Sequence, residues 1–247
     1  MIRPERRQFL AATSGAALAY SLKTVLAEEK MPPLKVLLFG GDLPDVRKAL
    51  EQQFKLEVFT AGQIVGKQGD DNVAGLEQLD DADLWIGSIH KRTLPSDKQL
   101  EHVRRFLAAG KPFVGYRAAS HAFQNWLAAD KAIWGAKYGG HHLLEKDPLL
   151  VIEPTPGALK HVIFKDIKIP RPESGSYFYT ELEPDVDVLL HSGLPGDMMP
   201  HTWTRQLAKT GNRIFYTRYD AKELAENDVC REIFLRGLAW TLEKKAG

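Results

Sequence analysis

Cysteine is almost absent from this sequence, since Cys230 is the only one among 247 residues. A single thiol cannot form an internal disulfide, so the fold must hold together without a cross-link in any redox compartment. The residues around Cys230 predict a helix, and we expect its thiol to be buried and structural. A disulfide-stabilised fold is excluded.

An excess of charge of one sign is also missing, because 33 lysines and arginines are balanced by 32 aspartates and glutamates. A near-neutral protein has no extended basic surface of the kind that binds nucleic acid or anionic lipid. We therefore expect no nucleic acid as a partner. No apolar run after residue 27 is long enough to cross a bilayer, so we also expect no stable membrane span after processing.

Compact metal and dinucleotide motifs are absent too. None of the eight histidines lies in His-x-His or His-Glu-x-x-His spacing, and Gly40-Gly41-Asp42 is not a Gly-x-Gly-x-x-Gly turn. A zinc-type site needs three or more ligands, so His121, His141 and an acid such as Asp220 would have to converge through the fold. We expect no cofactor, and a divalent metal is the alternative.

The first 27 residues are of a different kind. Arg6-Arg7 precedes a mildly apolar run rich in alanine and glycine, and Val25-Leu26-Ala27 supplies small residues at a cleavage position. This order is typical of a twin-arginine signal peptide. It predicts export to the periplasm and cleavage after Ala27. The alternatives are a cytosolic amphipathic leader and an uncleaved anchor, although polar residues within the run make it a poor permanent span.

Strand and helix patterns alternate through the first half of the body. Apolar runs predict strands, Pro44 and the capping box at Ser96–Gln99 predict helix starts, and 61–80 is expected to be a loop. The predicted strands are 34–39, 55–60, 83–87 and 112–116, and a further helix is predicted over 118–129. This order is typical of a parallel, doubly wound α/β sheet with helices on both faces.

The second half is richer in strand patterns. We expect strands at 149–153, 161–169, 186–191, 201–206 and 213–217, followed by one helix from about 222 to 244. No linker, repeat or low-complexity tract interrupts the body, so residues 28–247 are predicted to form a single domain.

Four segments, in this order along the chain, resemble the ThuA-like (trehalose utilisation) family. They are 110–119, Trp126 with 135–141, His161 with 177–179, and 200–204 with 211–216. The resemblance implies the flavodoxin-like fold of class I glutamine amidotransferases, with a mainly parallel sheet. It also implies a small, sugar-like ligand. Glu173–Tyr179 and Tyr219-Asp220 depart from the family pattern, which indicates a divergent member.

Arg117 lies at the strand-to-helix turn where class I glutamine amidotransferases carry their nucleophilic cysteine. A guanidinium is not a nucleophile, so the chain is predicted not to be a glutamine amidotransferase. Two roles for Arg117 remain open: a clamp for a carboxylate, phosphate or sugar hydroxyl, and a structural ion pair. The backbone N–H groups of this turn are expected to form an exposed binding nest.

The other candidate residues lie near predicted strand ends, where such sheets bind their ligands. His121 and His141 are the candidate general acid/base residues, with hydrogen-bonded loop histidines as the alternative. Ser120 is not expected to pair with His121, because neighbouring side chains on a helix diverge. The candidate ligand-binding residues are Gly40, Gly41, His90, Arg117, Ser120, Tyr177 and Tyr179. Tyr177 and Tyr179 could instead be packing residues, and His90 a solvated loop residue.

These patterns predict an exported protein that binds or acts on a carbohydrate or a related polyhydroxylated small molecule. The sequence leaves open whether it is an enzyme. The alternative is a non-catalytic ligand-binding or scaffold module that kept the amidotransferase-like fold without its chemistry.

Overall fold

The computed structural model describes residues 32–40, 43–63, 73–88, 95–141, 150–170 and 177–243. The predicted signal segment lies outside these ranges, as do the candidates Gly41 and His90. No helix within the described ranges is long and apolar enough to span a membrane.

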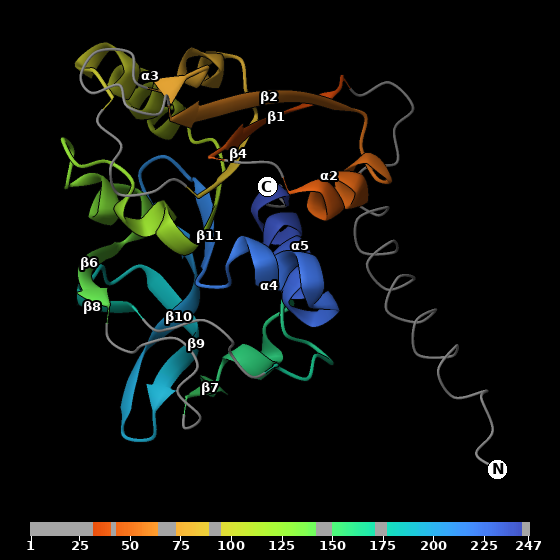
Figure 1. Cartoon of the computed structure of the whole chain (residues 1–247), viewed down its shortest axis with the longest axis vertical. Helices are drawn as coiled ribbons and strands as arrows, with labels where there is room; N and C mark the ends of the chain where they lie inside the picture. The colour runs from red at the N-terminus through yellow and green to blue at the C-terminus, as the bar shows by residue number, and fades with distance from the viewer. Residues whose placement is uncertain are drawn as a thin grey trace.

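The described strands form one nine-stranded sheet and one two-stranded sheet (Figure 1). The centre of the large sheet is parallel, in the order β2 (Leu56–Gln63), β1 (Leu34–Phe39), β4 (Leu84–Gly87), β5 (Phe113–Tyr116) and β11 (Arg213–Thr217). This order is the flavodoxin-like one. The predicted α/β fold class is confirmed.

Antiparallel strands extend the parallel centre at both edges. β3 (Val73–Ala74) pairs with β2 on one side. On the other side β10 (Asp197–Gln206), β9 (Val186–Leu194) and β7 (Val151–Pro154) continue from β11. The whole sheet is therefore mixed. The candidate site described below lies at the carboxyl ends of β5 and β11, which belong to the parallel part.

Helices cover both faces of this sheet, as predicted. α2 (Pro44–Glu51), α4 (Ala221–Glu226) and α5 (Asp228–Leu242) pack on one face (Figure 1). α3 (Asp97–Ala108) and the short turn η1 (Leu76–Asp80) pack on the other. The capping box that starts α3 is present, since Ser96 Oγ accepts from Gln99 N–H and Gln99 accepts from Ser96 N–H.

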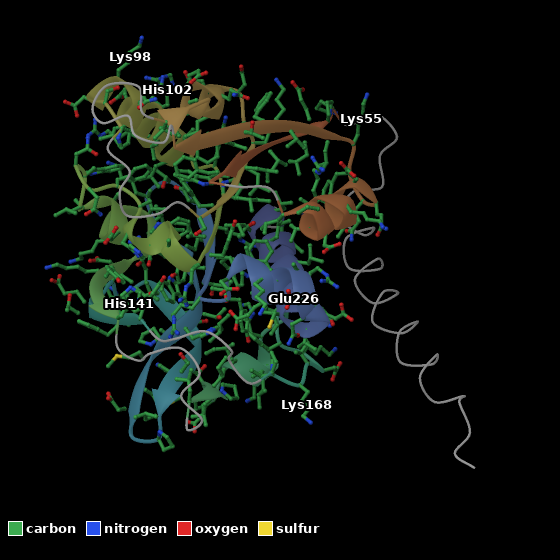
Figure 2. All side chains as sticks on the ribbon, in the orientation of Figure 1. Lys55, Lys98, His102, His141, Lys168 and Glu226 are labelled. Carbon is green, nitrogen blue, oxygen red and sulfur yellow. The ribbon has the colours of Figure 1, made fainter. Side chains whose placement is uncertain are left out.

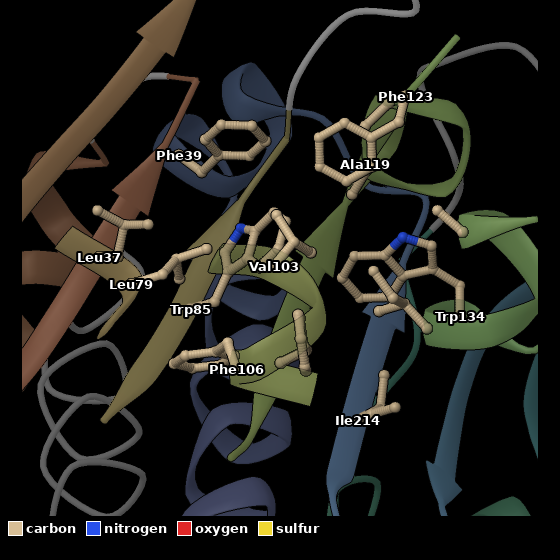
Figure 3. Close-up of a cluster of buried hydrophobic side chains, with 14 of the residues drawn as sticks. Leu37, Phe39, Leu79, Trp85, Val103, Phe106, Ala119, Phe123, Trp134 and Ile214 are labelled. Atoms are coloured by element: carbon tan, nitrogen blue, oxygen red, sulfur yellow. The ribbon is translucent and has the colours of Figure 1, made fainter. Parts of the chain in front are cut away.

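An aromatic core fills the space between α3 and the sheet (Figure 3). The Trp85 ring lies 4.9 Å from Phe39 and 5.0 Å from Phe113, measured between centroids. Trp134 closes this core beside β5, where a Cβ on Gly115 would come within 2.4 Å of its ring. Only a glycine at position 115 leaves room for the Trp134 ring. This close packing fixes the position of the chain that leads from Trp134 to the small sheet.

The small sheet pairs β6 (Ala136–His141) with β8 (Tyr177–Leu182) in antiparallel register, and His141 faces Tyr177. It lies against β10 of the large sheet (Figure 1). Trp203 of β10 donates from Nε1 to the Trp134 carbonyl at 2.9 Å and meets Tyr179 edge-on at 5.2 Å. The strand patterns of the sequence had not identified either strand.

The predicted helix over 118–129 is wrong. The chain instead makes a 3₁₀ turn, η2 (Arg117–His121), then irregular turns, and then a single π turn, η3 (Asp130–Trp134). Long-range contacts override the helical composition here. Asn125 donates to the Pro95 carbonyl at 2.5 Å, and the Phe123 ring packs into the core beside Trp85.

Three further expectations also need correction. Residues 61–80 contain the end of β2, β3 and η1 rather than only a loop. Residues 161–169 form turns, not a strand, because the Phe164 N–H returns to the His161 carbonyl. The single helix over 222–244 is two helices. Asn227 ends α4 and caps α5 by accepting from the N–H groups of Val229 and Cys230.

Candidate functional site

The turn after β5 is sharp and conformationally strained. Arg117 has a φ of 46°, in the left-handed region that side chains other than glycine rarely adopt. Two hydrogen bonds hold the turn: Tyr216 OH donates to the Arg117 carbonyl at 2.5 Å, and Ala118 N–H donates to Ser88 Oγ at 3.1 Å. The sharp turn expected at this position is present.

The Ser88 contact corrects the expectation of an exposed backbone nest. Ala118 is the residue directly after the position of the amidotransferase nucleophile, and its N–H group already has a partner. Any anion bound at this turn would have to compete with the Ser88 hydroxyl for that donor. The other candidate binding groups at this turn are side chains.

The turn faces a group of rings that surround Tyr177. The Arg117 guanidinium carbon lies 4.6 Å from the centroid of the Tyr177 ring, at cation–π distance. The rings of His121, Tyr138 and His141 lie 5.3, 5.3 and 5.1 Å from it, each nearly perpendicular to it. We call these five residues the Tyr177 cluster.

The two histidines of the cluster have different environments. His121 is buried and stacks on Tyr138 with centroids 3.9 Å apart. His141 is exposed at the end of β6, and Figure 2 shows it well away from Glu226 of α4. His141 is therefore accessible from solution, whereas the His121 ring is enclosed within the cluster.

Ser120 and His121 do contact one another, which corrects the sequence prediction. Ser120 Oγ lies 3.3 Å from His121 Nδ1, because the chain here is a tight 3₁₀ turn and the Nδ1 edge lies close to the backbone. Ser120 is completely buried. This pair is a hydrogen bond within the wall of the site and not an accessible nucleophile with its base.

Three buried hydroxyl groups form a network beneath the cluster. Tyr216 OH lies 3.1 Å from Tyr179 OH and 3.2 Å from Ser120 Oγ. Burial raises the pKa of Tyr179 to about 12 and holds that of Tyr216 well above its ordinary value. Both phenols therefore stay protonated near neutral pH and can act as hydrogen-bond donors.

Arg218 is a site residue that the sequence reasoning missed. It directly follows β11, is fully buried, and donates from Nη1 to Ser192 Oγ at 2.5 Å. Its guanidinium carbon lies 5.6 Å from the Tyr177 centroid. Burial, and then the charge of Arg117, lower the pKa of Arg218. The available signal was an arginine at the end of a buried apolar strand, beside the strand that leads to Arg117.

His201 of β10 lies behind the two arginines. Its Nδ1 is 2.8 Å from Thr202 Oγ1, and its ring meets Tyr219 edge-on at 4.6 Å. Burial, followed by the charges of Arg218 and Arg117, holds the pKa of His201 well below its ordinary value. The imidazole is therefore neutral near pH 7 and adds no third positive charge.

Asp130 is a second missed residue with an unusual titration. It is only 8% exposed at the start of η3, and its carboxylate accepts the Tyr138 N–H. Burial raises its pKa to about 7, although the hydrogen bond from Tyr138 acts in the opposite direction. The group that fixes the backbone of Tyr138 thus changes its charge near neutral pH.

The structure brings most of the predicted site residues together. Gly40 follows β1 with a φ of 85° and donates its N–H to the Ala61 carbonyl at 2.9 Å, while its neighbour Phe39 accepts the Ser88 N–H at 3.0 Å. Asp220, proposed as a third metal ligand, caps α4 instead. Those brought together are Arg117, Ser120, His121, His141, Tyr177 and Tyr179.

The described ranges contain no group of three or more His, Cys, Asp or Glu side chains suited to hold a metal ion. The arrangement is instead one of aromatic faces, hydroxyl donors and guanidinium groups. It can bind an organic molecule through stacking and hydrogen bonds.

Comparison with protein families gives a match over nearly the whole body of the chain. The model of the ThuA family, described as trehalose utilisation, matches residues 35–241. A comparison with curated proteins gives no match.

Solved structures with the same fold include two proteins described as ThuA-like. One, from Bacteroides uniformis ATCC 8492, has a TM-score of 0.61 at 14% identity and covers 90% of this chain and 97% of its own. The other, from Parabacteroides merdae ATCC 43184, has a TM-score of 0.53 at 17% identity, with 85% and 90% covered. A beta-galactosidase from Rahnella sp. R3 has a TM-score of 0.51 at 13% identity, and the match spans 85% of this chain but only 31% of that one.

Proposed function

Because the chain belongs to the ThuA family, described as trehalose utilisation, we propose that it is an exported protein that binds a carbohydrate or a related polyhydroxylated small molecule at the Tyr177 cluster. The observation that carries this proposal is the convergence of two histidines, two tyrosines and Arg117 at the ends of β5, β6 and β8. Aromatic faces pack against the C–H faces of sugar rings, and polar edges bind their hydroxyl groups.

Catalysis on such a ligand would use the histidines of the cluster. His141 is exposed and His121 is hydrogen-bonded to Ser120, so a proton could leave or reach a bound hydroxyl through either imidazole. The Arg117 guanidinium would stabilise negative charge that develops on a ligand oxygen.

The second candidate is a binding module without catalysis, and the turn after β5 favours it. An arginine stands where an amidotransferase has its nucleophile, and the next N–H group is bound to Ser88. Acyl-transfer chemistry at this turn would lack its nucleophile, and the Ala118 N–H would have to leave Ser88 to bind an oxyanion. Product analysis separates the two candidates: an enzyme changes the bound sugar, whereas a module returns it intact.

The test compares His141→Ala with Lys137→Ala, because both side chains are exposed on β6 and only His141 touches Tyr177. The protein starting at residue 28 is titrated by calorimetry with a panel of neutral and acidic mono- and disaccharides. We expect binding of at least one sugar, with affinity lowered about tenfold in His141→Ala and unchanged in Lys137→Ala. Binding of no sugar, or equal affinity in both variants, would contradict the proposed site.

A further inference from the structure

Two irregularities interrupt the ladder of the small sheet. The residue pairs on either side of them belong to one register, in which Gly139 would stand opposite Tyr179. The structure places Tyr138 opposite Tyr179 instead, and the two register shifts on either side of Tyr138 cancel one another. Gly139 on β6 and Thr180 on β8 thus fall between successive pairs, as the extra residue of a β-bulge does.

This displacement decides which side of the small sheet Tyr138 faces. Successive side chains on a strand point to opposite faces, so Tyr177 and Tyr179 share one face and Phe178 points to the other. A Cβ on Gly139 would come within 2.1 Å of the Phe178 ring, so Gly139 belongs to the Phe178 side. Its neighbour Tyr138 therefore faces the Tyr177 side. In a regular ladder the two would be exchanged, and the Tyr177 side would present a glycine in place of a ring.

The ring contacts agree with this placement of Tyr138. Its ring stacks on His121 with centroids 3.9 Å apart, and it lies 5.3 Å from Tyr177 and 6.3 Å from His141. Tyr138 and His141 are three residues apart, so a regular strand would point them to opposite faces. The irregularity brings both side chains to the same face.

Asp130 holds the backbone of Tyr138 from outside the small sheet. It lies at the start of η3, is only 8% exposed, and accepts the Tyr138 N–H with its carboxyl group. A hydrogen bond to a buried acceptor is costly to break, because the partner groups then have no water to replace it. The displaced residue is therefore fixed by a side chain of a different element.

From these observations we propose that Gly139 and Asp130 are positioning residues of the carbohydrate site. Gly139 permits the displaced backbone and Asp130 fixes it, so that the Tyr138 ring becomes part of the Tyr177 cluster. Bulges beside functional sites re-aim side chains in this way. The inference rests on the proposed function and adds the residues that decide whether this ring is present for the ligand.

The first arm of the test adds a methyl group where the Phe178 ring lies. In Gly139→Ala the new Cβ and the ring cannot both keep their places, whereas Gly139→Ala combined with Phe178→Ala removes the obstruction. Gly157→Ala is the matched control. Gly157 has a φ of −81°, and apart from its chain neighbours an added Cβ would meet no described atom within 4 Å.

The second arm changes the acceptor of the Tyr138 N–H. Asp130→Leu has a similar size but no acceptor, and Asp130→Asn keeps a side-chain oxygen that can accept the bond. Each variant is first checked for cooperative thermal unfolding. If Gly139→Ala does not fold, the comparison of Asp130→Leu with Asp130→Asn decides the matter.

Two measurements are made on each variant. Nuclear Overhauser contacts from the Tyr138 ring to the rings of His121 and Tyr177 report its placement without any ligand. Calorimetric titration with a sugar that binds the wild type reports the consequence for the site.

We expect Gly139→Ala and Asp130→Leu to lose the ring contacts and to bind the sugar about tenfold more weakly. The double variant and Asp130→Asn should recover both, and Gly157→Ala should match the wild type. Ring contacts that persist in both Gly139→Ala and Asp130→Leu would overturn the inference.

The outcomes also separate this inference from the proposed function. If the ring contacts change as expected and the wild type binds no sugar, the carbohydrate proposal is wrong and the placement of Tyr138 by these two residues stands. If the wild type binds a sugar and the affinities of the variants do not follow the ring contacts, the inference is wrong and the carbohydrate proposal stands.

Discussion

Because the backbone at Arg117 is left-handed, the contribution of this residue to ligand binding and its effect on the stability of the fold can be measured separately. A side chain at a φ of 46° is strained by the contact of its Cβ with the following carbonyl, and glycine is free of that contact. The Tyr216 hydroxyl and the Ala118 N–H hold the turn in this form. The guanidinium is thus kept in place at the expense of local strain.

This strain can be measured with two substitutions that both remove the guanidinium. Arg117→Gly should unfold with a free energy about 1 kcal/mol higher than Arg117→Ala, because only the alanine keeps a Cβ in the left-handed region. Chemical denaturation of both variants provides the comparison. Equal stabilities, or a more stable alanine variant, would mean that the backbone at position 117 is not left-handed.

Asp130 gives a prediction about pH. Its pKa is about 7 in the folded protein against 3.8 as a reference for the unfolded chain, so the folded state binds the proton more tightly. The resulting stabilisation is complete below pH 3.8 and is lost as the pH rises through 7. Between pH 4 and 8 the wild type should lose up to about 4 kcal/mol relative to Asp130→Asn.

Denaturation curves at several pH values, for wild type, Asp130→Asn and the surface variant Asp81→Asn, test this assignment. Asp81 is an exposed residue at the end of η1, so Asp81→Asn should follow the wild type. Parallel curves for the wild type and Asp130→Asn would show that the Asp130 carboxyl titrates normally.

Among the elements, those with a strong local signal could be predicted from sequence. β1 is a near-continuous apolar run from Leu34 to Phe39, interrupted by Lys35, and α3 starts at a capping box, so both were placed closely. β6 contains Gly139 and Gly140 between polar or aromatic residues, a composition that does not predict a strand. Its partner β8 follows residues outside the described ranges, and the pairing of the two is a long-range contact.

The site was predictable to the same extent. Arg117, His121 and His141 were found because a turn or a family resemblance marked them. Arg218 was not, because its place at the end of an apolar strand does not show which residues lie beside that strand. Its position near Arg117 follows from the pairing of β5 with β11, which joins segments about a hundred residues apart. The Ser120–His121 contact was missed for a local reason, because the sequence predicted a helix where the chain makes a 3₁₀ turn.

The break between α4 and α5 gives a prediction at the scale of an element. Asn227 Oδ1 accepts from two N–H groups at the start of α5, at 3.0 and 3.1 Å. Asn227→Ala removes this cap and should lower the free energy of unfolding by about 1–2 kcal/mol. Glu226→Ala is the control, because Glu226 is exposed and its ion pair with Lys222 spans 3.8 Å at the surface. Equal effects of the two substitutions would contradict the capping role.

At the scale of the whole molecule, the two hydrophobic clusters that hold the fold are built from residues between Leu34 and Leu242. A twin-arginine signal delivers folded protein, so export and folding should be separable properties of this chain.

We therefore predict that replacing Arg6 and Arg7 with lysine stops export without altering the fold. In a host that has twin-arginine transport, the variant should accumulate in the cytoplasm with the same thermal unfolding as the wild type. Cell fractionation and N-terminal sequencing of the exported wild type provide the measurements. Delivery of the variant to the periplasm would contradict the twin-arginine signal, and an intact N-terminus on exported protein would contradict cleavage after Ala27.

The division of the site between two sheets has a consequence for how this protein can change. The large sheet supplies the guanidinium groups from β5 and β11, whereas the small sheet supplies Tyr138, His141 and Tyr177. Exposed positions on β6 and β8 can be exchanged without opening the aromatic core around Trp85. A directed library restricted to those two strands should change the ligand preference of the proposed site without lowering the thermal stability of the large sheet, so recognition and folding can change independently.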